Sequence, residues 1–164
     1  MTWMMVRSAI LPKNLRRARM KAEGQKSRPK PVEFKILREG KSTYVLGDGS
    51  KLVGRVIVLK VMKAGPEEYG IKSSSVFVVY PPDRLAGEPS RGKPPTEELT
   101  KRIVEEDIDL NPEKEEWNTF QVNGVTLSVK LVVTKVSRTD QFDETGDPLY
   151  VINSEPVIKM SRAK

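Results

Sequence analysis

The chain contains two segments of closely similar sequence. Residues 43–63 read TYVLGDGSKLVGRVIVLKVMK, and residues 119–138 read TFQVNGVTLSVKLVVTKVSR. With one gap at Gly47, six of the 20 aligned positions are identical and seven more are conservative replacements. Similarity over so many aligned positions is poorly explained by chance, so the sequence favours an internal duplication. The identical pairs are Thr43 and Thr119, Gly49 and Gly124, Leu52 and Leu127, Val58 and Val133, Lys60 and Lys135, and Val61 and Val136.

Each copy has the pattern of a β-hairpin. The dipeptides Asp48-Gly49 and Asn123-Gly124 favour type I′ turns, in which both central residues need positive φ. The runs after them are rich in β-branched residues and apolar on both faces, which is typical of central strands in a sandwich or barrel. A third strand is expected in each unit, at 75–82 and 148–156, after loops at 63–74 and 137–148.

These units predict a mainly β fold. Each unit is too small to bury its own sheet, so we expect the two to pack across a pseudo-twofold axis as a single sandwich or barrel-like domain. A short acidic helix, with Thr96 as its N-cap and Leu99 and Ile103 on one face, is expected to connect them. The predicted boundaries are 1–30 for a basic arm, 31–82 for the first unit, 83–116 for a Pro-rich linker with the helix, and 117–164 for the second unit.

Positive charge is concentrated at the N-terminus. The chain carries 29 Lys and Arg against 22 Asp and Glu, a net charge of +7. Residues 1–30 hold nine of the cations and one acid, Glu23, so their net charge is +8, while the remaining 134 residues sum to −1. Pro12 and Gly24 suit the start and end of a helix in this segment. A single-signed arm on a neutral body is typical of attachment to nucleic acid or another polyanion.

The candidate binding residues are cations, and most of them lie in the arm. The alternative interpretation of the arm is a solvated tail or a targeting segment. A secondary basic surface is predicted on the strands, where simple alternation places four cations on one face and Lys60 and Lys135 on the other. The alternative there is that strand charges discourage edge-to-edge aggregation. The arm residues are Lys13, Arg16, Arg17, Arg19, Lys21, Lys26, Arg28 and Lys30, and the strand residues are Arg55, Lys63, Lys130 and Arg138.

Residues that usually carry catalysis are scarce. The chain has no Cys and no His, which removes thiolate chemistry and the commonest metal ligand and general base. Gly40-Lys41-Ser42 matches only the end of a P-loop. Acidic residues cluster at 105–109 and 140–147 without the spacing of a calcium loop, so they are interpreted as turns. We therefore expect no catalytic residues, no metal and no cofactor.

Aromatic residues make up 6% of the chain, too few to predict a base-stacking surface. Tyr44 and Phe120 occupy equivalent places, as do Phe77 or Tyr80 and Tyr150, and all are interpreted as core.

Two functional hypotheses follow. The first is a non-enzymatic protein that binds structured RNA, or a ribonucleoprotein such as the ribosome, through the arm, while the β body supplies a shape or a protein contact. The second is a protein–protein adaptor or assembly subunit that uses the β body. The sequence contains no run of 18 apolar residues, so no membrane-spanning helix is expected. A cytoplasmic location is expected. Abundant charges and few amides are weakly typical of a thermophile.

Overall fold

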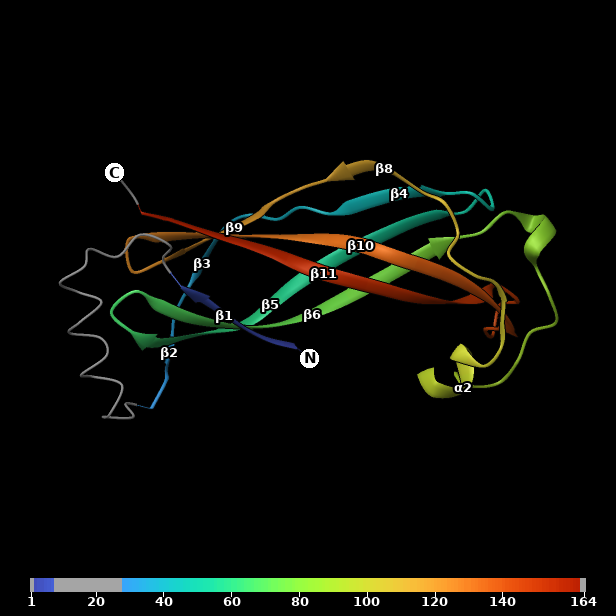
Figure 1. Ribbon diagram of the computed structural model, residues 1–164, viewed down its shortest axis with the longest axis horizontal. Helices are drawn as coiled ribbons and strands as arrows, with labels where there is room; N and C mark the ends of the chain where they lie inside the picture. The colour runs from blue at the N-terminus through green and yellow to red at the C-terminus, as the bar shows by residue number, and fades with distance from the viewer. Residues whose placement is uncertain (1, 8–27, 163–164) are drawn as a thin grey trace.

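Two antiparallel β-sheets form most of the protein (Figure 1). The computed structural model describes residues 28–162, and the backbone of residues 2–7. Within these residues neither sheet closes on itself, and two apolar clusters lie between the sheets. The mainly β prediction is therefore confirmed, in its sandwich rather than its barrel form.

The first sheet, sheet A, has the order β1-β6-β5-β4-β8, with β2 also paired to β5. The second, sheet B, has the order β11-β10-β9-β3, with β7 paired to β10. The strands of sheet A are β1 (Thr2–Arg7), β2 (Lys30–Val32), β4 (Ser42–Leu46), β5 (Lys51–Gly65), β6 (Glu68–Tyr80) and β8 (Leu110–Glu115). The remaining elements are β3 (Lys35–Arg38), η1 (Asp83–Leu85), α2 (Thr96–Thr100), β7 (Ile103–Glu105), β9 (Asn118–Val122), β10 (Val125–Phe142) and β11 (Pro148–Arg162).

The strands β2–β6 and β7–β11 follow the same path. In each series the first strand (β2 or β7) pairs with the long fourth strand (β5 or β10). The second strand (β3 or β8) crosses to the edge of the opposite sheet. The third strand (β4 or β9) returns and forms a hairpin with the long strand. The long strand then pairs with the fifth strand (β6 or β11). The register of the long strand shifts between Val58 and Lys60 in β5, and between Val133 and Lys135 in β10. These two bulges fall at aligned positions of the repeat.

The core has two parts with corresponding members. In the first, Val61 and Tyr69 of sheet A pack with Phe120 and Leu127 of sheet B. In the second, the residues aligned with these four pack together, each from the other sheet. Tyr44 and Leu52 come from sheet A, and Val136 and Tyr150 come from sheet B. The two long hairpins, β5–β6 and β10–β11, cross one over the other (Figure 1). Each half of β5 therefore packs against the opposite half of β10.

Some local predictions were wrong. Only Asn123 and Gly124 both have positive φ; Gly49 has positive φ but Asp48 does not. The extra residue Gly47 makes the first turn a three-residue loop, closed by a hydrogen bond from the Leu46 amide to the Ser50 carbonyl at 2.8 Å. The expected loop at 63–74 is also wrong, because β5 and β6 continue through it and leave only residues 66 and 67 between them.

The connecting helix is shorter than predicted. It begins at Thr96 itself, follows Pro95 as the N-cap residue, and ends at Thr100. Leu99 is buried as expected, but Ile103 belongs to β7 because residues 103–105 pair with β10. At the N-terminus, residues 2–7 form a strand paired with β6. The predicted helix between Pro12 and Gly24 lies outside the described residues.

Candidate functional site

The predicted arm cations are only partly placed. Arg28 and Lys30 lie beside Lys63 around a shallow recess at the end of the β2–β5 pair, so three predicted residues from two regions meet. None of the three forms an ion pair with another described residue. In Figure 1, β2 and α2 lie at opposite ends of the molecule, so this basic end is remote from the helix. Lys13, Arg16, Arg17, Arg19, Lys21 and Lys26 lie outside the described residues.

The centre of the basic end is a like-charge pair. Lys30 and Lys63 lie directly opposite each other across β2 and β5. The aligned pair in the second unit is Glu105 and Arg138, across β7 and β10. There the Arg138 Nη2 atom donates to the Glu105 Oε2 atom at 2.9 Å. Like charges directly opposite on a sheet are destabilising, whereas opposite charges are stabilising. The same ladder position thus carries a stabilising pair in one unit and a repulsive pair in the other.

The structure does not gather the four predicted strand cations in one place. Lys130 is half-buried, its Nζ atom 4.8 Å from the centre of the Trp117 ring and 4.0 Å from a Glu115 oxygen. Arg138 is held by Glu105, and Arg55 is exposed near the middle of β5.

The alternation behind that prediction was wrong, because the bulge reverses it. Arg55 lies opposite exposed Val76, whereas Lys63 lies opposite buried Tyr69.

An apolar row covers the outer face of sheet A. Tyr80 is 59% exposed, and Val76, Val78 and Ile57 are each nearly half exposed. Val78 lies opposite Val53, and Tyr80 lies opposite Lys51, which in turn lies opposite Val45. Apolar side chains therefore occur on this face of β4, β5 and β6, with Lys51 and Arg55 among them. Of the two alternatives predicted for the core, Phe77 packs against both apolar clusters and Tyr80 does not, while Tyr44 and Phe120 are buried as predicted.

The corresponding face of sheet B is more polar. By register, Ser128 takes the place of Val53, and Lys159 takes the place of Val78. Ser161 corresponds to Tyr80 in the same way. An apolar outer face is therefore not required by this arrangement of strands. Sequence reasoning missed the row because 76–80 is apolar at every position and reads as a central strand buried on both faces.

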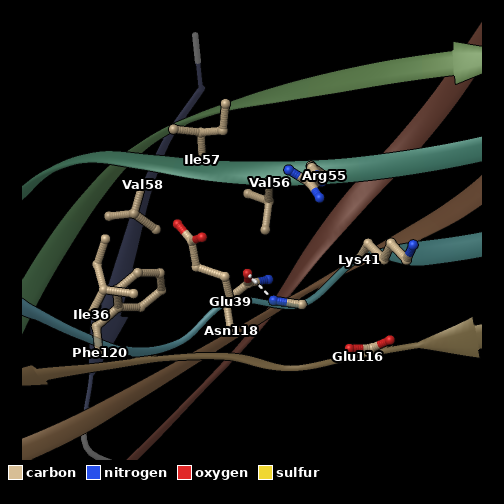
Figure 2. A pocket seen from close by; sticks show the side chains of 11 residues that line it. Ile36, Glu39, Lys41, Arg55, Val56, Ile57, Val58, Glu116, Asn118 and Phe120 are labelled. Atoms are coloured by element: carbon tan, nitrogen blue, oxygen red, sulfur yellow. Dashed lines mark hydrogen bonds between the residues drawn. The ribbon is translucent and has the colours of Figure 1, made fainter.

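A cavity of about 360 Å³ opens between β3, β5 and β9. Its walls are apolar at Ile36, Val56, Val58 and Phe120. Glu39 reaches from the β3–β4 connection toward β5, and Lys41 and Arg55 lie farther toward β4 (Figure 2). The cavity exists because the chain leaves sheet A after β2, pairs with β9 as β3, and rejoins sheet A at β4.

Gly40 fixes this return to sheet A. Its amide donates to the Asn118 Oδ1 atom at 2.8 Å (Figure 2). A Cβ atom at this position would lie 2.6 Å from the Glu116 Cβ and 2.9 Å from the Trp117 carbonyl oxygen. The Gly40-Lys41-Ser42 sequence is therefore a tight crossing between sheets, and its last residue, Ser42, begins the strand β4.

The first hairpin turn is tied to sheet B by a buried carboxylate. Asp48 is 4% exposed, and its side chain accepts hydrogen bonds from the Ser50 amide at 2.9 Å and the Tyr150 hydroxyl at 2.8 Å. The Arg138 Nε atom lies 3.9 Å from the same carboxylate. Burial, together with the hydrogen bond to Asp48, raises the pKa of Tyr150. These contacts join two sheets and serve the fold.

The acidic clusters form turns and surface ion pairs. Asp143 Oδ1 accepts hydrogen bonds from the amides of Thr145 at 2.8 Å and Asp147 at 3.0 Å, as in an Asx turn. Partial burial opposes ionisation of Asp143, but a hydrogen bond from the Thr145 hydroxyl at 2.7 Å, together with these amide bonds, lowers the pKa of Asp143 below the usual value. Across residues 28–162, no cluster of three or more acidic side chains has the geometry to hold a metal ion.

Comparisons with protein-family models, curated proteins and solved structures found no match. Among the described residues, no helix is both long and apolar enough to cross a bilayer.

Proposed function

We propose that this protein is a non-enzymatic nucleic-acid-associated protein that binds structured RNA, or a similar polyanion, through its basic end and N-terminal arm. The observation that carries the proposal is the pairing of Lys30 with Lys63, beside Arg28, where the second unit has an ion pair. A phosphate backbone placed over the recess relieves the repulsion between the two ammonium groups. The eight-charge excess of residues 1–30 extends the same attraction along the chain.

The internal duplication belongs to the same proposal. Its support is the shared strand path, the bulges at aligned positions and the corresponding core clusters. Two copies that keep one fold can diverge wherever the fold does not constrain them. We therefore interpret the differences between equivalent positions as the places where the first unit acquired a function.

The test is retention of an RNA hairpin by the full chain across a salt series. Each phosphate contact contributes about 0.7–0.9 to the slope of log K against log salt. Replacing Lys30→Gln and Lys63→Gln together should weaken binding and reduce that slope, while Lys101→Gln, an exposed cation near α2, should leave both unchanged. Equal slopes for all three proteins would rule out the basic end as a phosphate site.

A second candidate function is protein binding by the outer face of sheet A. Its support is the apolar row of Val45, Val53, Ile57, Val76, Val78 and Tyr80. Exposed apolar patches flanked by polar residues are typical of protein interaction sites. Lys51 and Arg55 lie among these residues on the same face, so the row suits a partner with acidic groups around an apolar centre. A second copy would bring like charges together.

Sheet B supplies the variant that tests this second function. The substitutions Val53→Ser, Val78→Lys and Tyr80→Ser give sheet A the residues of its counterpart, so folding should be preserved. A photo-crosslinking side chain at position 80 should trap a discrete protein partner in cells of the source organism, and adding Val53→Ser and Val78→Lys should abolish the adduct. The same group at position 161 is the control. Identical adducts from positions 80 and 161 would mean nonspecific contact.

A further inference from the structure

We propose that the cavity between β3, β5 and β9 accepts an extended polypeptide segment of another protein, which adds as a strand along residues 55–60 of β5. This site is independent of the basic end. Pairing of β5 with β4 stops at Gly54, and pairing with β2 begins only at Val61. Between them, within residues 2–7 and 28–162, β5 pairs on one side only, with β6. The six residues left open span about 20 Å at the usual rise of a strand.

The equivalent edge of β10 is closed by specific hydrogen bonds. The Ser42 hydroxyl donates to the Leu131 carbonyl at 2.5 Å, and the Val133 amide donates to the Tyr44 hydroxyl at 3.0 Å. The Ile108 amide donates to the Val136 carbonyl at 2.8 Å. The edge groups of β10 are therefore satisfied by side chains of β4 and by the chain before β8.

In the part of the chain that the structure describes, the edge of β5 has no such caps. Val56 and Val58 correspond to Leu131 and Val133 in the repeat. The register of Val56 and Val58 with β6 matches the register of Leu131 and Val133 with β11. The backbone groups of Val56 and Val58 therefore point away from β6, as those of Leu131 and Val133 point away from β11. Phe120 stands where Tyr44 stands in the other unit and has no hydroxyl. Asn118 replaces Ser42, but its amide group is committed to Gly40 and to the Val129 carbonyl.

Unpaired backbone groups at the wall of a cavity favour a ligand that supplies backbone groups in return. Strand addition does this, and pockets beside the open edge select alternate side chains of the incoming segment. The apolar wall formed by Val56, Val58 and Phe120 suits aliphatic side chains. Glu39 suits a basic side chain, and Lys41 with Arg55 suits an acidic one nearer β4 (Figure 2). The expected occupant is thus an alternating apolar segment with a basic residue followed by an acidic one.

The test measures binding of a short, capped, fluorescein-labelled peptide to the full chain by anisotropy. Valines alternate with threonines in the peptide, with one Lys placed for Glu39 and one Glu placed for Lys41 and Arg55. One control peptide is N-methylated on alternate amides, and another has the Lys and Glu exchanged. The plain peptide should bind, N-methylation should weaken binding by about fivefold or more for each hydrogen bond lost, and the exchange should also weaken it.

Phe120→Tyr is the decisive variant. It restores the hydroxyl that caps the equivalent edge, so it should preserve folding and weaken peptide binding by about fivefold or more. Tyr44→Phe makes the reverse change at the other edge and should leave peptide affinity unchanged. In the free protein, the Val58 amide should exchange with solvent faster than the Val133 amide, and the peptide should slow it. Equal protection of the two amides, or binding that ignores N-methylation or Phe120→Tyr, would overturn the proposal.

Discussion

Gly54 lies against Leu131 where β5 crosses β10. A Cβ atom on Gly54 would stand 2.8 Å from the Leu131 Cδ2 atom and 3.1 Å from the Phe77 ring. In the repeat alignment Gly54 of the first unit corresponds to Val129 of the second, and Leu131 of the second corresponds to Val56 of the first. A small and a large residue thus meet at this crossing, whereas the two equivalent positions both carry a residue of intermediate size. The crossing of the two long strands therefore depends on complementary volumes at one point.

Gly54→Ala should destabilise the protein by about 1–3 kcal/mol, because the added methyl overpacks a buried crossing. Leu131→Val should partly relieve this, giving a favourable coupling energy in a double-mutant cycle. Gly65→Ala is the matched control, since a Cβ atom there meets Glu68 at an ordinary 3.6 Å. Chemical denaturation of the four proteins of the cycle, and of the Gly65→Ala control, measures the effect. Additive losses would show that the two positions do not share space.

Tyr44 should make stability fall at high pH. Its hydroxyl is buried, donates to Glu115 at 2.7 Å and accepts from Val133, and burial chiefly raises its pKa from 10.0 to about 12. Because the folded pKa lies above the unfolded one, this stabilisation is complete below pH 10 and is lost as pH rises toward 12. The loss is about 2–3 kcal/mol for a shift of this size.

The Tyr44→Phe variant isolates that contribution. It should cost about 1–3 kcal/mol at neutral pH, because the Val133 amide loses its partner. The difference in unfolding free energy between the native protein and the variant should then shrink between pH 10 and 12. A difference that stays constant over this range would contradict the assigned shift.

Asp48→Ala should cost about 1–3 kcal/mol, since it removes the buried acceptor of the Ser50 amide and the Tyr150 hydroxyl. Glu113→Gln, at an exposed position of β8, should cost less than about 0.5 kcal/mol. Thermal unfolding of both variants measures the comparison. Similar losses would mean that the Asp48 contacts contribute little.

The duplicated pattern predicted the sheets but not their connections. Alternation and β-branched runs identify β5 and β10 because each long strand buries aligned residues such as Leu52 and Leu127. The bulges after Val58 and Val133 have no turn residue to reveal them, so the predicted faces of Lys63 and Arg138 were wrong. Strand β7 formed where a helix was expected because pairing with β10 outweighs the local propensity around Ile103.

The candidate sites were less visible in the sequence than the fold. Arg28, Lys30 and Lys63 were predicted singly, and only the β2–β5 pairing brings them together. The apolar row and the open edge of β5 depend on which faces and edges of the sheets are covered. This coverage follows from the pairing of β3 with β9 in sheet B and of β8 with β4 in sheet A.

Lys30→Glu tests the central claim most directly. It recreates at β2 the arrangement of Glu105 and Arg138, so it should stabilise the fold by about 0.2–1 kcal/mol. Retention of an RNA hairpin by the full chain, measured in the same buffer, should fall, with a shallower salt dependence. Higher stability with weaker binding is the predicted result. Unchanged RNA binding in the correctly folded variant would contradict the claim that the Lys30–Lys63 pair is a polyanion site.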